Sequence, residues 1–244
     1  MKTNISTYVL VVLVLGTLGL AFAQHNQNIS ADNRLKQPQE KKNAFPTAEY
    51  DEPDLPDPTR NRIRKEKQLR HNDFKIVASN PPDWQTERVF VGEGAMSFPS
   101  LPVRESAYIV VGTVTAAEAH VSENKKNIFS EFTISVSKVF KTANSSMVEG
   151  SEIAVSRIGG FVKYPNGQTV LYRISRSNMP VVGDRYLFFL TSKKNQDLSI
   201  LTAYSIGGES VSPLDESEQF EALRGLSEEA LLQKLQALLT SLPN

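Results

Sequence analysis

Two stretches of the chain have hydrophobic patterns that predict β-strands. The first begins at Ala107 and reads AYIVVGTVTA. Apolar residues fill both of its alternating sets of positions, so we expect a strand that is covered on both faces. The second stretch reads IFSEFTISVSKVF and ends at Phe140. Its Phe132, Ile134 and Val136 alternate with polar residues, which predicts an antiparallel strand with one buried face.

Each of these strands contains one irregularity. Gly112 interrupts the apolar run of the first strand, and a glycine there indicates either a bulge or bend, or the close approach of a neighbour. In the second strand Val139 follows Val136 by three residues, so the alternation slips. A bulge near Ser137 would return both valines to one side of the sheet.

Short β segments at regular spacing continue to about Leu214, which is typical of a sandwich or a small barrel. We count six or seven strands, and those after the opening pair are expected at residues 152–157, 161–164, 169–174, 185–190 and 198–204. Gly159-Gly160 is expected to end the first of these strands. Asn166-Gly167 predicts a hairpin that is closed by a two-residue type I′ turn.

Beyond Pro213 the apolar pattern becomes helical. Ser227 is a candidate N-cap for the last helix. The residues that share one face of this helix are Leu231, Leu235, Leu238 and Leu242. We expect this face to dock on the β domain, and dimerisation through it is the alternative.

The first 23 residues have the pattern of a secretory signal peptide, with one basic residue, an apolar run and a small-residue site at Ala21-Phe22-Ala23. We expect cleavage before Gln24 and an exported protein that is secreted, periplasmic or on the cell surface. The alternative is an uncleaved single-pass anchor at the N-terminus, although the apolar run is shorter than the roughly 20 residues that usually span a bilayer.

Residues 24–104 are polar and rich in proline, and we expect a disordered or extended linker. An acidic block at residues 49–57 is followed by a basic block at residues 60–70. The two blocks can pair with each other as a solvated segment. The alternative is a short basic helix that contacts anionic lipid, polysaccharide or nucleic acid.

These patterns divide the chain into a signal peptide (1–23), the linker (24–104), a β domain (105–213) and C-terminal helices that pack on it (214–244). Within the β domain, the segments AYIVVGTV, SEFTISVSKVFK, EGSEIAV and PVVGDRYLFFL together resemble the netrin-like module of the OB-fold class, whose best-known members are the tissue inhibitors of metalloproteinases. Similar modules occur in exported bacterial proteins of unassigned function, and the chain is more similar to those. The resemblance covers residues 105–206 and implies an all-β fold, a small Greek-key OB-like barrel with helices at its C-terminal end.

The chain departs from those inhibitors in one decisive feature. The inhibitors bind the protease zinc through an N-terminal cysteine, whereas this sequence has no cysteine. No inhibitory residue is therefore carried over. The lack of cysteine also excludes disulfides, zinc–thiolate sites and cysteine nucleophiles. We predict no cofactor and no metal site.

Few residues of the β domain suggest catalysis. His120 is its only histidine, and with Glu118 and Glu123 nearby we interpret it as an exposed histidine in a turn. The sequence contains no Gly-x-Ser-x-Gly motif of a serine hydrolase. The sequence does not exclude a catalytic pair of carboxylates that come together only in the folded chain, so a carbohydrate-active hydrolase is the enzyme alternative.

One hairpin combines basic and aromatic residues, and it supplies the candidate ligand-binding residues Lys163, Tyr164, Arg173 and Arg176. Arg157, Phe161 and Tyr172 belong to the same region. A basic, aromatic β face is how OB-folds bind oligonucleotides or oligosaccharides. Alternation, however, sends Tyr172 to the core when Arg173 points outward. With 11 basic and 9 acidic residues between positions 105 and 213, we expect a structural hairpin with at most weak binding of anionic polymers.

The sequence as a whole predicts an exported, non-enzymatic binding or interaction module. An extracytoplasmic protein or a glycan is the expected partner, and nucleic acid is not. Membrane contact is expected only if the signal segment is retained, and the protein is expected to be a monomer. A carbohydrate-active hydrolase and an OB-type domain that binds anionic polymers are the alternatives.

Overall fold

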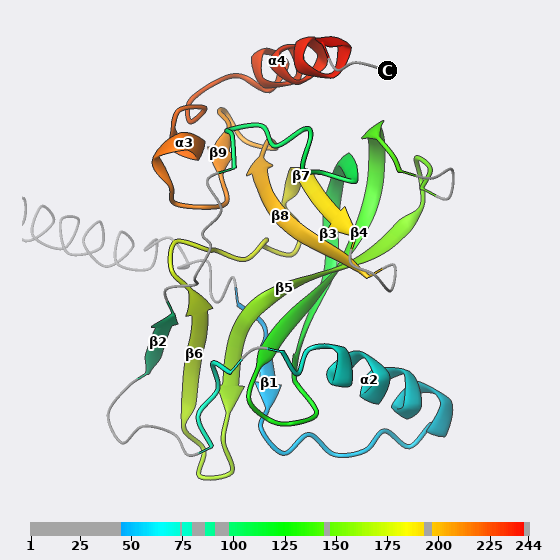
Figure 1. Cartoon of the computed structure of the whole chain (residues 1–244), viewed down its shortest axis with the longest axis vertical. Coiled ribbons are helices and arrows are strands. Elements are labelled where there is room, and N and C mark those ends of the chain that lie inside the picture. Colours follow the sequence, from blue (N-terminus) through cyan, green and yellow to red (C-terminus); the bar gives the residue numbers. More distant parts are fainter. Residues whose placement is uncertain are drawn as a thin grey trace, which may run out of the picture. The chain divides into compact units, whose positions relative to one another are not determined.

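The computed structural model describes residues 45–73, 75–79, 86–90, 98–143, 147–192 and 197–241, so the predicted signal peptide lies outside the described residues. Ala44–Asn244 form one compact unit. Its strands are β1 (Thr47–Glu49), β2 (Glu87–Phe90), β3 (Tyr108–Val121), β4 (Ile128–Lys141), β5 (Glu152–Lys163), β6 (Thr169–Ile174), β7 (Arg185–Ser192), β8 (Leu198–Ser205) and β9 (Ser212–Pro213), and its helices are α2 (Pro58–Arg70), α3 (Glu218–Glu221) and α4 (Glu228–Ser241) (Figure 1).

Five strands close into a β-barrel. They follow the order β5-β4-β3-β7-β8, and β8 pairs with β5 to complete the ring. All of these pairs are antiparallel except β5 with β8, where Val155 lies opposite Leu198 in a parallel pair. The first barrel strand, β3, thus pairs with the second, β4, and with the fourth, β7. The third barrel strand, β5, pairs in parallel with the fifth, β8. This is the Greek-key arrangement of an OB-fold, and the fold class expected from the sequence is confirmed.

The two irregular positions in the opening strands shape the barrel as predicted. The pairing of β3 with β4 passes from Val111–Lys138 to Gly112–Val136 and so skips Ser137, which is a bulge. Gly112 is also a point of close approach, because a Cβ at this position would collide with the side chain of Ile134. Both readings of this glycine are therefore correct. The interior of the barrel is apolar and includes Val110, Val114, Phe132, Ile134, Val155, Phe188 and Leu190.

Strands β3, β4 and β5 extend beyond the barrel and build a second apolar core with β1 and β6. β1 pairs in parallel with the end of β5, and β2 pairs in parallel with β6. The buried side chains of this core are Ala48, Ile76, Val77, Ala119, Val121, Ile128, Val162, Tyr164, Val170 and Tyr172. The two tyrosine hydroxyls lie 2.5 Å apart. Tyr164 donates a hydrogen bond to the carbonyl of Ala78 (2.9 Å), whose N–H points back to the Tyr172 hydroxyl (3.4 Å).

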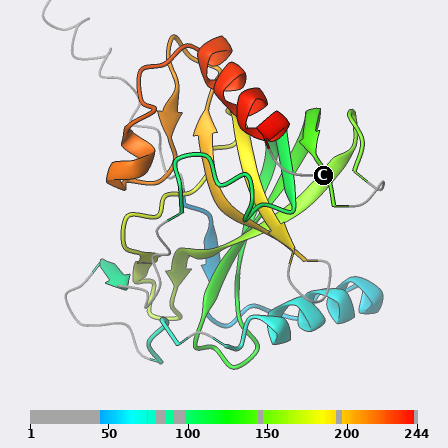
Figure 2. The same ribbon diagram turned by 45° about the horizontal axis from the view of Figure 1, so that its top comes forward.

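The C-terminal helices pack on the other side of the barrel strands, as expected. Ser227 caps α4, since its hydroxyl accepts a hydrogen bond from the N–H of Ala230 (3.2 Å). Leu231 and Leu235 are fully buried in a third core that includes Ile109, Leu187, Phe189 and Tyr204. Leu238 is 43% exposed and does not share this burial. Figure 2 shows α4 lying across the barrel end of the molecule, opposite α2.

The expectation that residues 24–104 form a disordered or extended linker is wrong for the part that the structure describes. Residues 45–50 join the sheet through β1, and residues 58–70 form α2. An apolar stripe is the sequence pattern that predicts a packed helix, and α2 has none because it buries only Gln68. Polar contacts hold this helix in place instead. Residues 24–44 lie outside the described part.

Two turn predictions also require correction. β5 does not end at Gly159-Gly160 but continues through both residues, which adopt positive φ angles of 120° and 150°. Side chains at Gly160 would press on Ile128 and Ser130, so glycine permits the close packing of β4 on β5. The hairpin of β5 and β6 is confirmed, but its turn is a three-residue loop in which Gly167 alone has a positive φ of 85°.

Candidate functional site

The candidate site is a cleft between α2 and the barrel, and the start of α2 explains how its side chains are placed. Asp57 is the N-cap, and its carboxylate accepts hydrogen bonds from the N–H groups of Thr59 (2.8 Å) and Arg60 (3.2 Å). Pro58 occupies the first turn, where its missing N–H costs nothing. Basic residues in the last turn, Lys67 and Arg70, suit the negative end of the helix dipole.

Ion pairs attach α2 to the barrel. The ammonium of Lys67 lies 2.7 Å from the Glu131 carboxylate on β4, and the Arg70 guanidinium lies 2.8 Å from Asp197, which precedes β8. All four side chains are between a quarter and about a third exposed. Pairs this exposed contribute about 0.2–1 kcal/mol each. The helix is therefore held by several weak, salt-sensitive contacts.

The segment that follows α2 is anchored more firmly. The imidazole of His71 stacks on Phe129 with 3.8 Å between ring centroids. Asn72 accepts from the backbone N–H of Asn124 (3.0 Å) in the β3–β4 loop, and the N–H of Ile76 donates to the Lys126 carbonyl (2.7 Å). Together with β1 on the other side, these contacts make α2 a strap that is fixed at both ends.

A cleft of about 520 Å³ opens beside this strap, and we call it the α2 cleft. Its lining residues are Glu52, Leu55, Arg60, Ile63, Arg64, Lys67, Glu118, His120, Phe129 and Glu131. The volume is in the range of small-molecule sites, about 300–1,000 Å³. Charged groups of both signs face this space, with the exposed aliphatic side chains of Leu55 and Ile63 at its rim.

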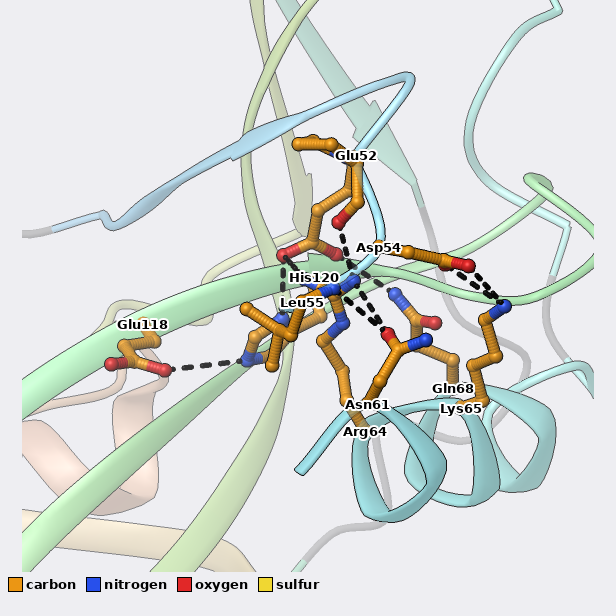
Figure 3. A network of polar contacts seen from close by, with 10 residues as sticks. Glu52, Asp54, Leu55, Asn61, Arg64, Lys65, Gln68, Glu118 and His120 are labelled. Carbon is orange, nitrogen blue, oxygen red and sulfur yellow. Dashed lines mark hydrogen bonds and ion pairs between the residues drawn. The ribbon is translucent and has the colours of Figure 1, made fainter. Parts of the chain in front are cut away.

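Glu52 is the centre of the polar network in the α2 cleft (Figure 3). Its carboxylate accepts from Arg64 (3.0 Å) and from the Gln68 amide (2.8 Å), and it lies 3.4 Å from Nδ1 of His120. The other ring nitrogen of His120 lies 3.7 Å from Glu118. Because α2, β3 and the 51–57 segment each supply a member, the network ties three parts of the chain together.

The charge state of Glu52 follows from these neighbours. Burial by itself raises the pKa of the Glu52 carboxyl, but the hydrogen bond and charge of His120 and the charge of Arg64 outweigh burial and lower this pKa. Glu52 is thus an ionised anchor at neutral pH.

A smaller cavity of about 90 Å³ lies on the other side of the Lys67–Glu131 ion pair. It is lined by His71, by Ala154, Val155 and Ser156 of β5, and by Asp197 and Leu198. Lys67, Phe129 and Glu131 line both this cavity and the α2 cleft. The two cavities are thus neighbours that share a wall of α2 and β4 residues.

His120 is not the exposed turn histidine expected from the sequence. It lies within β3, and its side chain is only 13% exposed. The reason is that β3 extends to Val121, beyond the end of the apolar run. In the described residues, no group of three or more histidine, aspartate or glutamate side chains is placed to hold a metal ion.

The four residues predicted for ligand binding are not brought together as one exposed patch. Tyr164 is 2% exposed, whereas Lys163 points outward and pairs with Glu49 (3.0 Å). Arg173 pairs with Glu87 at 2.5 Å. Arg176 is exposed and follows β6 with a positive φ of 61°.

Arg157, placed in the same region by the sequence, is buried and forms an ion pair with Asp215. The predicted division of the hairpin into a core face with Tyr172 and an outer face with Arg173 is confirmed, since Tyr172 is fully buried. Only the outer face is therefore open to a ligand, and two of its cations already have acidic partners.

The residues of the α2 cleft were missed, although one signal pointed to them. The sequence predicts that the acidic block at residues 49–57 can pair with the basic block at residues 60–70, and the two blocks do pair in Arg64–Glu52 and Lys65–Asp54. The contacts of the basic block with Glu131 and Asp197 join residues that are far apart in the chain, so no local pattern predicts them.

No family model matches the chain, and no curated protein matches its sequence. Within the residues that the structure describes, no helix is both long and apolar enough to cross a membrane.

Proposed function

We propose that this protein is an exported, non-enzymatic binding module, related in kind to netrin-like OB domains, and that the α2 cleft is its ligand site. The observation that carries the proposal is the cleft itself, about 520 Å³ in volume, on the outer face of the first two barrel strands. Export is supported by the N-terminal sequence pattern alone.

The place of the cleft on the fold supports binding. OB-folds bind ligands on the face of their second and third strands and on the loops that join strands one to two and four to five. In this chain those strands are β4 and β5, and the first loop is residues 122–127. Phe129 and Glu131 of β4 line both cavities under the strap.

The charges in the cleft favour binding over hydrolysis. A glycoside hydrolase needs one carboxylic acid that stays protonated at neutral pH and a second, ionised carboxylate. Glu52 has a lowered pKa, and Glu131 is fixed by two hydrogen bonds from Lys67 (2.7 and 2.8 Å). These acids serve better as anchors of the cleft than as proton donors.

The test is a screen of small sugars, carboxylates and amines against the ¹⁵N-labelled protein, read from backbone amide shifts. We expect the shifts to gather at the residues that line the α2 cleft, and to weaken in Ile63→Ser. Leu69→Ser is the matched control, because Leu69 is an exposed aliphatic residue of the same helix outside the cleft. Amide shifts that gather elsewhere, or that are as large in Ile63→Ser as in the unaltered protein, contradict the proposed site. Polysaccharide cleavage that Glu118→Gln abolishes would favour the hydrolase.

A further inference from the structure

The barrel surface under α2 is acidic. Its carboxylates come from separate parts of the fold: Glu123 from the β3–β4 loop, Glu131 from β4 and Asp197 from the residue before β8. Glu131 and Asp197 are each paired with a cation of α2. Glu123 accepts a hydrogen bond from the Asn72 side chain (3.3 Å), just beyond the helix.

The helix that covers this surface is basic, and its only buried residue is Gln68. Six of its 13 residues are arginine or lysine and one is glutamate. Its aliphatic residues Ile63 and Leu69 are 46% and 58% exposed. Complementary charge, and not burial, therefore selects α2 as the occupant of the surface.

We propose that this acidic surface is a docking site for a cationic helical segment of a partner protein, and that α2 is its built-in competitor. The inference rests on the proposed function, because Glu131 of this surface also lines the α2 cleft. A partner segment replaces Lys67 and Arg70 at Glu131 and Asp197, while β1 and residues 71–73 and 75–79 keep the strap attached at both ends.

The charge of the surface decides the class of partner. When α2 lifts away, Glu131 and Asp197 lose their counter-charges, so an incoming group must be cationic. Anionic glycans and nucleic acids are repelled by the same carboxylates. Its acids lie on β4, in the β3–β4 loop and just before β8, so the surface suits a helix of a few turns better than a single small cation.

Attachment in the same chain gives α2 a large advantage over a free segment. Tethered groups compete at an effective concentration on the order of millimolar. A free peptide at micromolar concentration therefore binds only when the contacts of α2 are weakened.

The experiment uses a labelled peptide of residues 57–71, which carries the α2 sequence, and measures its binding to the full chain by fluorescence anisotropy. The unaltered protein is expected to bind the peptide weakly, without saturation. The variant Lys67→Gln/Arg70→Gln is expected to bind it at least about tenfold more tightly, because the competitor has lost its two barrel contacts. Adding Glu131→Gln and Asp197→Asn to that variant is expected to remove the gain.

The matched control is Arg60→Gln/Arg62→Gln, which removes the same charge from α2 but leaves both barrel ion pairs intact. Binding should stay weak in this variant. Circular dichroism and thermal unfolding check the fold, and Arg70→Gln alone serves if the double variant unfolds.

The proposal is overturned if the double variant, or Arg70→Gln where the double variant unfolds, shows no gain in affinity for the peptide. It is also overturned if the Arg60 and Arg62 control gains as much affinity, or if the gain survives loss of the two acids. A double variant that gains affinity for a heparin tetrasaccharide and not for the peptide would also overturn it. The fragment screen probes the unaltered protein with α2 in place, so its result and the peptide result can fail separately.

Discussion

Glu52 and His120 are 68 residues apart in the chain, yet Oε1 of Glu52 lies 3.4 Å from Nδ1 of His120. This contact joins the segment before α2 to the first barrel strand. Because Arg64 and Gln68 bind the same carboxylate, one side chain fixes the path of the strap over the barrel.

Replacing Glu52 by glutamine should therefore loosen the strap in a pH-dependent way. The carboxyl has its ordinary pKa, near 4.5, in the unfolded chain and a lower pKa in the folded protein, with Arg64 and His120 facing it. The ionised form thus stabilises the fold above pH 4.5, and this contribution is lost as the pH falls through the folded-state value. At neutral pH we expect Glu52→Gln to lower the free energy of unfolding by about 1 kcal/mol.

Thermal unfolding of the two proteins across acidic pH measures this effect. The difference between them should narrow below pH 4.5. Glu229→Gln, an exposed change on α4, is the control and should show no such difference. A gap that stays constant with pH would contradict the role of the Glu52 charge.

The tyrosine pair of the second core predicts a coupled effect. Tyr164→Phe removes the acceptor of the Tyr172 O–H and the donor to the Ala78 carbonyl, so we expect a loss of about 1–3 kcal/mol. The double change to phenylalanine at both tyrosines should cost less than the sum of the single changes. Denaturant unfolding of the four proteins provides the comparison. Strict additivity would show that the hydroxyl pair does not act as a unit.

The basic hairpin should contribute little to retention on heparin. Changing Lys163, Arg173 and Arg176 together to serine removes three cations, but two of them are already neutralised by Glu49 and Glu87. We expect retention to fall only slightly and to fade at high salt in both proteins. A large loss with the fold intact would instead support an OB-type domain that binds anionic polymers through this hairpin.

Gly112→Ala should be among the most damaging single-methyl changes in the barrel. The added Cβ would collide with Ile134 and lie 2.8 Å from the carbonyl oxygen of Ser135. Overpacking of this kind costs about 1–3 kcal/mol. Gly207→Ala is the control, because its nearest neighbour is Arg185 Cβ at 3.6 Å, an ordinary contact. Equal thermal stabilities of the two variants would contradict this packing argument.

Local patterns predicted the barrel well because each of its strands carries its own signal. The alternation at Phe132 and Ile134, the bulge at Ser137 and the glycine at position 112 are all local signals, because each can be recognised from the residues next to it in the sequence. The Greek-key topology was predicted from the strand spacing and from the resemblance to the netrin-like module, which both concern the same 100 or so residues.

The candidate site escaped prediction because it depends on partners that are distant in sequence. α2 has no apolar face, so its helical state depends on a cap at Asp57, on Glu131 of β4 and on Asp197 just before β8. His120 was read as a turn residue because the apolar run of β3 ends before it. The charges were visible in the sequence, but their pairing was not.

The parallel pairing of β1 with β5 also bears on how the protein is made. Thr47 lies opposite Phe161 and Glu49 opposite Lys163, a separation of 114 residues. During synthesis, β1 emerges long before the strand that it must join, and it has no local hairpin partner. We therefore expect the barrel to form first and the strap to close over it in a late, slower step, during which the acidic face is open to other chains.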